Sequence, residues 1–281
     1  MLKWLKRKNA DKSSQPKGSV VQERNFDTKA AIRVLDMIKM EFGLDYERQK
    51  SITLRKIERF ALKRDIHSFE ELAISLQSSG SLKTELINML TVGETYFYRE
   101  FEQIELIGDE IISGKCESVL SAPCSTGEEV YSILLYIKSR DRLPPSLRIT
   151  GIDINTDALT SAKKGCFSQR SVSQLPPDIT KEWFASSGER YCIDSSLKKH
   201  TDFLYANIFD RDFQRLGKFD AVLSRNMMIY FTDEEKKRAL RQLSSVMHPG
   251  SILLLGHADI SFVPDGFEKI RRRRAVYFKK I

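Results

Sequence analysis

Two glutamates, Glu128 and Glu129, stand where a helix is predicted to begin, just after an apolar strand. They close the segment SAPCSTGEE at residues 121–129, whose small residues and Gly127 let the backbone approach a ligand closely. The segment has neither a G-x-G-x-x-G pattern nor the lysine of a phosphate-binding loop, which disfavours a nucleoside triphosphate. The two carboxylates could simply complement the helix dipole. They would also suit a ligand that carries an ammonium group or hydroxyl donors.

A further acid, Asp153, ends the next predicted strand within the run GIDIN at residues 151–155. In α/β nucleotide folds an acid at this place accepts hydrogen bonds from a ribose diol. A ribose to hold, an ammonium and a sulfonium to neutralise, and no pyrophosphate together describe S-adenosylmethionine. The two acidic positions therefore predict a site for that cofactor.

These residues must be positioned by a doubly wound α/β sheet, because short apolar strands alternate with helical patterns after Gly114. In such a sheet ligands bind beyond the carboxyl ends of the strands. The stretch from Cys166 to His200 interrupts the alternation, which predicts an inserted subdomain with a helix near residues 179–184. We expect strands at residues 118–122, 148–152, 203–207, 219–224 and 251–255, and helices near 129–138, 156–163 and 233–247.

The part of the chain from Phe26 to Leu90 is predicted to be all-helical, because its apolar residues recur at helical spacing. Its second helix has a strongly basic outer face, opposed by Glu47 and Glu58 alone, which requires an acidic partner or open water. The basic residues are Arg48, Lys50, Arg55, Lys56, Arg59, Lys63 and Arg64.

The net charge of +8 is concentrated at the two ends of the chain. Residues 1–24 and 271–281 together contribute +11, so that residues 25–270 carry −3. A body with negative net charge argues against nucleic-acid binding. The first 24 residues have the composition of a disordered basic tail; weak surface binding through Met1–Lys8 is the alternative. Arg271–Arg274 are expected to cap a final strand over Ala275–Phe278.

The chain has four cysteines without a C-x-x-C pair and only four histidines. We therefore expect neither a disulfide framework nor a zinc site, and reduced thiols. No stretch approaches the roughly 20 apolar residues of a membrane-spanning helix, and the N-terminus has no apolar signal region. A cytoplasmic protein is predicted.

Five motifs, taken in order, resemble the signature of the CheR family of bacterial chemotaxis receptor methyltransferases. Their order and spacing match the family from about Phe26 to Phe278. The motifs are Leu90–Glu100, Ser121–Ser132, Gly151–Asn155, Ser224–Phe231 and Gly256-His257. The resemblance implies a protein-glutamate O-methyltransferase that makes glutamate γ-methyl esters on chemoreceptors, with S-adenosylmethionine as cofactor, S-adenosylhomocysteine as product and no metal.

The resemblance also implies roles for single residues. Arg99 and Tyr230 are the expected catalytic pair and face the transferring methyl group. Glu129 contacts the methionyl ammonium and Asp153 the ribose. The other cofactor contacts come from Thr95, Arg99, Asn207, Ile208, Asn226 and Met227.

The family pattern divides the chain into parts with different expected tasks. Arg55 and Arg59, one helical turn apart, are expected to dock the acidic flank of a receptor methylation helix. The loop at residues 186–191 is short, which leaves binding of a receptor's C-terminal tether peptide in doubt. The parts are a tail (1–24), a helical substrate-docking domain (25–92), a linker (93–114) and a methyltransferase domain (115–281) with the inserted subdomain (165–200).

Three positions depart from the family pattern, namely Gly93, Val130 and the pair Ala258-Asp259. None of them replaces the arginine, the tyrosine or the ribose acid, so activity is expected. The alternatives are a regulatory module that binds S-adenosylmethionine or S-adenosylhomocysteine without turnover, and methylation of another protein. Methylation of nucleic acid is a third reading, which lacks an N-P-P-Y or D-P-P-Y motif.

Overall fold

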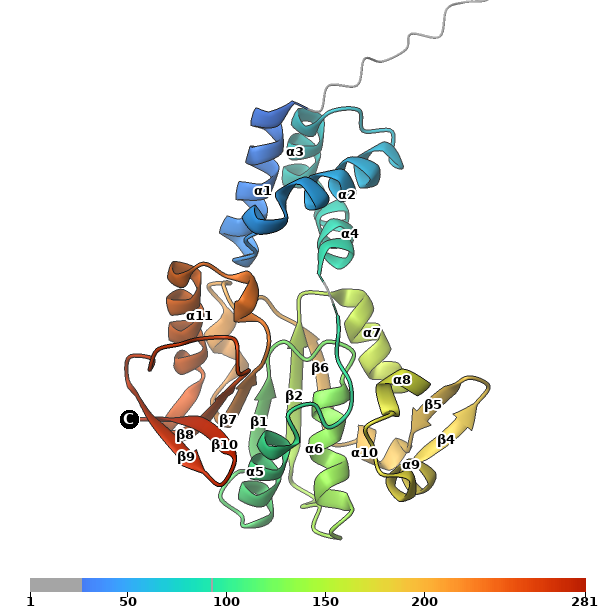
Figure 1. Ribbon diagram of the computed structural model, residues 1–281, viewed down its shortest axis with the longest axis vertical. Helices are drawn as coiled ribbons and strands as arrows, with labels where there is room; N and C mark the ends of the chain where they lie inside the picture. Colours follow the sequence, from blue (N-terminus) through green and yellow to red (C-terminus); the bar gives the residue numbers. More distant parts are fainter. Residues whose placement is uncertain (1–26, 92) are drawn as a thin grey trace, which may run out of the picture.

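The computed structural model describes residues 27–91 and 93–281, and Figure 1 shows a helical unit standing over an α/β unit. The predicted tail at residues 1–24, with its proposed surface segment, lies outside the described residues. The helical unit consists of α1 (Thr28–Phe42), the 3-10 helix η1 (Glu47–Gln49), α2 (Lys50–Leu62), α3 (Phe69–Ser78) and α4 (Gly80–Leu90). Arg48 belongs to η1 and Lys63 follows α2, so the basic run is longer than the helix itself.

Side-chain caps and one glycine fix the ends of these helices. Asp27 accepts the Ala30 N–H at the start of α1, and Ser68 and Ser79 cap α3 and α4 in the same way. Helix α1 ends at Gly43, which has a φ of 73°. A Cβ atom at Gly43 would lie 2.3 Å from the Phe209 ring. Glycine is therefore required both by the backbone conformation and by the contact with the α/β unit.

A seven-stranded sheet forms the centre of the α/β unit, in the order β6-β2-β1-β7-β8-β10-β9. The first five strands pair in parallel, and β10 pairs antiparallel with β8 and β9 on either side of it, which confirms the predicted mostly parallel sheet. The strands are β1 (Ser118–Ser121), β2 (Arg148–Asp153), β6 (Thr201–Tyr205), β7 (Phe219–Ser224), β8 (Met247–Leu255), β9 (Phe267–Arg272) and β10 (Ala275–Lys280). The predicted final strand over Ala275–Phe278 is β10, and Arg273 and Arg274 form the turn that precedes it, whereas Arg271 and Arg272 belong to the end of β9.

Helices cover both faces of this sheet, as a doubly wound fold requires. Successive residues of a strand point to opposite faces, so Val119 contributes to one core and Leu120 to the other. Helices α5 (Phe101–Ile112), α6 (Glu128–Lys138) and α7 (Thr156–Lys164) pack on the Val119 side, and α11 (Asp233–Ser245) packs on the Leu120 side. The chain order of the strands reverses between β1 and β7. In the sequence, β7 is preceded by the 3-10 helix η2 (Phe213–Leu216) and followed by the 3-10 helix η3 (Met228–Tyr230).

The interruption between residues 165 and 200 is a small antiparallel sheet of order β3-β5-β4 with short helices. Its elements are β3 (Cys166–Ser168), α8 (Gln169–Val172), α9 (Pro177–Trp183), β4 (Phe184–Ser187), β5 (Arg190–Ile193) and α10 (Ser195–Lys198). The helix predicted near residues 179–184 is α9, which ends one residue earlier because Phe184 begins β4.

One expectation about the cysteines is wrong: Cys166 and Cys192 form a disulfide bond. The reason is the strand register, since the two residues are direct partners in the antiparallel pair of β3 and β5. Cys116 and Cys124 are free and buried. Among the helices of the described ranges, none is long and apolar enough to cross a membrane. The domain limits given above stay predictions.

Candidate active site

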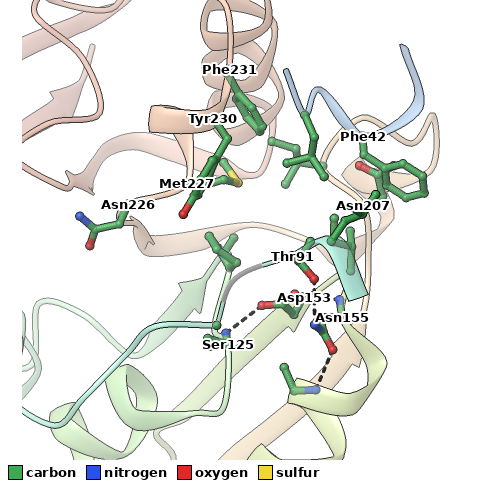
Figure 2. A pocket seen from close by; sticks show the side chains of 18 of the residues that line it. Phe42, Thr91, Ser125, Asp153, Asn155, Asn207, Asn226, Met227, Tyr230 and Phe231 are labelled. Carbon is green, nitrogen blue, oxygen red and sulfur yellow. Dashed lines mark hydrogen bonds between the residues drawn. The ribbon is translucent and has the colours of Figure 1, made fainter. Parts of the chain in front are cut away.

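Two adjoining pockets lie at the carboxyl ends of β1, β2 and β7, beneath the helical unit. The first encloses about 1080 Å³, including space open to solvent, and the second about 530 Å³. Pro123, Ser125 and Asn226 line both, so the pockets are two parts of one site. Figure 2 shows Asp153 and Asn155 on one side of the first pocket and Met227, Tyr230 and Phe231 across from them.

The structure brings the predicted cofactor and catalytic residues together around this site. Arg99 and Tyr230 line different pockets, which Asn226 joins. The first pocket is lined by Asp153, Asn207, Ile208, Asn226, Met227 and Tyr230, and the second by Thr95, Arg99, Glu129 and Asn226. Arg55 and Arg59 are exposed on α2 and line neither pocket.

Asp153 is the last residue of β2 and is 8% exposed. Its Oδ2 accepts the Ser125 N–H and its Oδ1 the Asn155 N–H, each at 2.8 Å. Burial raises the pKa of the Asp153 carboxyl above its ordinary value, although these N–H groups act in the opposite direction. The carboxylate is thus fixed in orientation at the wall of the first pocket.

The two glutamates at the start of α6 have different surroundings. Glu129 lines the second pocket, where its Oε1 accepts from the Ser121 hydroxyl at 2.7 Å and its Oε2 from Arg225 Nη1 at 2.9 Å. Glu128 is buried and accepts from the Ser171 hydroxyl at 2.6 Å, which ties α6 to the inserted subdomain. Position therefore favours Glu129 as the ligand-facing acid and gives Glu128 a structural task.

Asp259 holds the loop that carries Asn226 and Met227. This fully buried carboxylate accepts the N–H groups of Asn226 and Gly256 at 2.7 Å and of Met228 at 2.9 Å. Asn226 has a φ of 59°, so the loop needs such anchoring. Sequence reasoning noted Asp259 only as a departure from the family pattern. Its strongest signal would have been an acid among apolar residues just after the last parallel strand.

The side chain of Asn207 is committed to the protein rather than free for a ligand. Its amide donates to the Glu41 carbonyl at 2.8 Å, and its Oδ1 accepts the Phe209 N–H at 3.0 Å. This links the end of α1 to the loop after β6. The contact of Asn207 with the cofactor stays a prediction. It would have to come from the backbone of Asn207 or from the part of its amide that these two bonds leave unused.

Sequence reasoning missed that the helical unit supplies part of the pocket wall. Tyr46, Gln49, Thr53 and Lys56 line the first pocket. Thr53 is 4% exposed, which is unusual for a polar residue of a surface helix. Nothing in the sequence indicated this contact, because the burial of Thr53 and the place of Lys56 in the pocket wall depend on how α2 packs over the α/β unit.

Arg99 lies in a tightly constrained turn. Both neighbours, Tyr98 and Glu100, have positive φ values of 59° and 49°. The Tyr98 N–H donates to the Ser132 hydroxyl at 3.0 Å, and the Arg99 carbonyl accepts from Arg225. The Arg99 side chain donates to the Glu94 carbonyl at 3.0 Å, with its guanidinium 5.8 Å from the centre of the Tyr96 ring.

The residues of the site fit S-adenosylmethionine. The Ser125 hydroxyl lines both pockets and is buried without a hydrogen-bond partner in residues 27–91 and 93–281, so it can still bond to a ligand. The carboxylates of Asp153 and Glu129 line the first and the second pocket. Apolar side chains, among them Ile152, Ile208 and Met227, line the first pocket between the helical unit and the sheet. No cluster of His, Cys, Asp and Glu that could hold a metal occurs in the described part of the chain.

Comparisons with known proteins identify the family of the chain. Residues 93–276 match the family described as CheR methyltransferase, SAM binding domain. A chemotaxis protein methyltransferase of Campylobacter jejuni is 34% identical over 241 residues, which are 85% of this chain and 91% of that protein. Chemotaxis protein methyltransferase 2 of Vibrio cholerae is 32% identical over 219 residues, or 74% of this chain and 76% of that protein.

Among solved structures, an O-methyltransferase family protein from Burkholderia thailandensis covers 63% of this chain and 42% of its own, at 14% identity and a TM-score of 0.36. The family match and the curated relatives suffice: the chain belongs to the CheR family of S-adenosylmethionine-dependent methyltransferases.

Proposed function

We propose that this methyltransferase forms glutamate γ-methyl esters on the methylation helices of chemotaxis receptors in the cytoplasm and releases S-adenosylhomocysteine. The observation that supports the proposal is the pair of joined pockets beneath a basic helix, because Tyr230 lines one pocket, Arg99 lines the other and Asn226 lines both. The names of the relatives from Campylobacter jejuni and Vibrio cholerae support chemotaxis as the process.

Bound S-adenosylmethionine supplies a methyl group that its sulfonium already activates. The acceptor needs no general base, because a glutamate with an ordinary pKa of about 4.3 is ionised at pH 7. What the protein must provide is alignment and partial exclusion of water, and positioning of this kind is worth several kcal/mol. The buried walls of the first pocket and the covering helical unit serve this purpose.

Arg99 is the residue we assign to the acceptor carboxylate. One of its guanidinium nitrogens is engaged by the Glu94 carbonyl, and the side chain is only partly buried at the mouth of the second pocket. A grip through the remaining donors would orient the carboxylate without neutralising both oxygens, which keeps it nucleophilic. Tyr230, across Asn226 in the first pocket, would pack beside the methyl group.

The outer face of α2 is the surface we assign to the receptor. Arg55 and Arg59 are exposed there and form no ion pair with any residue of the described ranges. Ile52, 51% exposed, lies between them and η1 and offers an apolar contact. Lys56 is exposed on the same helix and also lines the first pocket, so the basic face continues to the site. An amphipathic helix with an acidic flank is the complementary partner.

The test is transfer of labelled methyl groups from S-adenosylmethionine to chemoreceptor-containing membranes, followed by treatment with base. We expect base-labile label on the receptors with wild-type protein and a loss of about 100-fold or more with Arg99→Ala, the range for removing one transition-state contact. Label on another protein would replace the receptor as substrate. Binding of S-adenosylhomocysteine with no label at all would favour a regulatory module instead.

A further inference from the structure

We propose that Arg225 is a positioning residue that ties the methionine end of the cofactor site to the turn carrying Arg99; this rests on the proposed roles of Glu129 and Arg99. Arg225 directly follows β7, next to the point where the chain order of the sheet reverses. Its side chain is 3% exposed, so its charge is almost entirely out of water. A buried guanidinium must be matched by acceptors, and its partners define what it does.

Two acceptors from different parts of the site bind this guanidinium. Nη1 donates to Glu129 Oε2 at 2.9 Å, and Nη2 donates to the backbone carbonyl of Arg99. Nε lies 3.7 Å from Glu100 Oε2, an ion pair without a hydrogen bond. The planar fork of arginine can reach both acceptors at once, whereas the single ammonium of lysine cannot.

The charges of this cluster do not cancel. One guanidinium faces two carboxylates, Glu129 and Glu100, and of these two only Glu129 lines the second pocket. The exposed imidazole of His257 has its Nδ1 3.4 Å from Glu100 Oε2. Because Arg225 alone does not neutralise both carboxylates, Glu129 can still pair with the ammonium of a methionyl group. Arg225 thus fixes Glu129 in place without neutralising the site.

The same side chain restrains the turn of Arg99. Tyr98 and Glu100 both occupy the left-handed region, and such residues persist only when their surroundings hold them. Ser132 holds the turn on one side through the Tyr98 N–H, and Arg225 holds it on the other through the Arg99 carbonyl. Displacing Glu129 and relaxing the Arg99 turn are therefore consequences of one substitution.

The proposal is tested on the full chain with Arg225→Lys, using two ligands that differ only in the amino-acid part. Calorimetry should show affinity for S-adenosylhomocysteine falling roughly 10- to 100-fold, the range for a lost charge-assisted contact. Affinity for 5′-methylthioadenosine, which has no methionyl ammonium, should change by less than about twofold on the same reasoning. Arg238→Lys is the control, because Arg238 also donates to backbone carbonyls, those of Met40 and Phe209, but lines neither pocket.

An equal loss of affinity for both ligands would show that Arg225 merely supports the fold, and unchanged affinity for both would show that Ser121 alone holds Glu129. Either result overturns the proposal.

The second arm measures methyl transfer at saturating cofactor. Arg225→Lys should slow methyl transfer in the wild-type background but add little to the effect of Arg99→Ala. If the two substitutions slowed transfer independently, Arg225 would not act through Arg99. The ligand arm needs no receptor, so it distinguishes failure here from failure of the proposed substrate.

Discussion

The Asn88 side chain forms two hydrogen bonds with Thr156: its Nδ2 donates to the Thr156 hydroxyl at 2.8 Å and its Oδ1 accepts the Thr156 N–H at 3.0 Å. Asn88 lies on α4 and Thr156 is the first residue of α7. The neighbouring Asn155 donates to the Thr91 hydroxyl at 2.8 Å, a bond drawn in Figure 2. The helical unit is thereby fastened to the start of α7, the helix that follows Asp153.

Asn88→Ala should therefore weaken cofactor binding, although Asn88 lines neither pocket. The substitution leaves the Thr156 N–H without its side-chain acceptor, which should lower the free energy of unfolding by about 1–2 kcal/mol. Denaturation and calorimetry with S-adenosylhomocysteine measure the two effects. Thr160→Ala is the matched control, because the Thr160 hydroxyl bonds only within α7. Unchanged affinity in Asn88→Ala would mean that the pocket does not depend on this fastening.

Asp153 should make cofactor affinity depend on pH. Burial raises its pKa, so its carboxyl takes up a proton at higher pH than an exposed aspartate near 3.9 and then loses acceptor capacity for a ribose. Affinity for S-adenosylhomocysteine should fall as the pH is lowered, and the fall should begin at a higher pH than an exposed aspartate would give. Asp153→Asn should bind about 10- to 100-fold more weakly at pH 7 and show no such slope. Asp157→Asn, at an exposed aspartate of α7, should behave as wild type; a slope that survives in Asp153→Asn would assign it to another group.

Asp259→Ala should destabilise the protein and the adenosine side of the site together. Three N–H groups lose their acceptor in a fully buried place, which predicts a loss of about 2–4 kcal/mol in the free energy of unfolding. Affinity for 5′-methylthioadenosine should fall as well, because Asn226 and Met227 lose their anchor. Asp265→Ala, at an exposed aspartate, is the control. A stable variant with normal affinity would show that the loop holds itself.

Reversing two charges on α2 should separate receptor docking from cofactor binding. The double substitution Arg55→Glu and Arg59→Glu should raise the receptor KM roughly tenfold, about the effect of turning one or two attractive surface contacts into repulsions. Affinity for S-adenosylhomocysteine should not change. Arg142→Glu with Arg274→Glu makes the same change of charge at exposed arginines elsewhere. Equal effects of both pairs would reduce the result to net charge.

The disulfide between Cys166 and Cys192 predicts a count of reactive thiols. Of four cysteines, two should react with a thiol reagent in denatured, unreduced protein. Closing a loop across 26 residues is worth about 3.5 kcal/mol in the chain-entropy account. Cys192→Ser should lower stability by up to about that amount, whereas Cys116→Ser leaves the crosslink intact. Four reactive thiols would show that the purified protein is reduced.

The sequence was sufficient to predict the parts of the site that follow from strand order. Asp153 and Glu129 could be predicted because Asp153 ends one parallel strand and Glu129 lies at the start of the helix after another, and all such strands end at one edge of the sheet. Strands β1, β2 and β7 were predicted to within one residue because their apolar runs are largely buried, whereas β6 is mostly exposed and begins two residues before the predicted range.

Other features depend on contacts between distant segments, which periodicity does not encode. Helical spacing identifies the apolar face of α2 but not its neighbour, so the contribution of Gln49 and Thr53 to the pocket was missed. Strands β3 and β4 have three and four residues, too few to show an alternation. The pairing of Cys166 with Cys192 depends on their register, and Asp259 acts through backbone groups that have no signature in the sequence.

Helix α2 turns one side to the cofactor pocket and the other to the proposed receptor surface. Two ligands that each bind more tightly to one placement of the same helix are thermodynamically linked, and such linkage is reciprocal. Any preference of α2 for one placement when the pocket is filled must be felt with equal strength by a docked receptor. The affinity for the receptor would then depend on whether the pocket holds S-adenosylmethionine or S-adenosylhomocysteine.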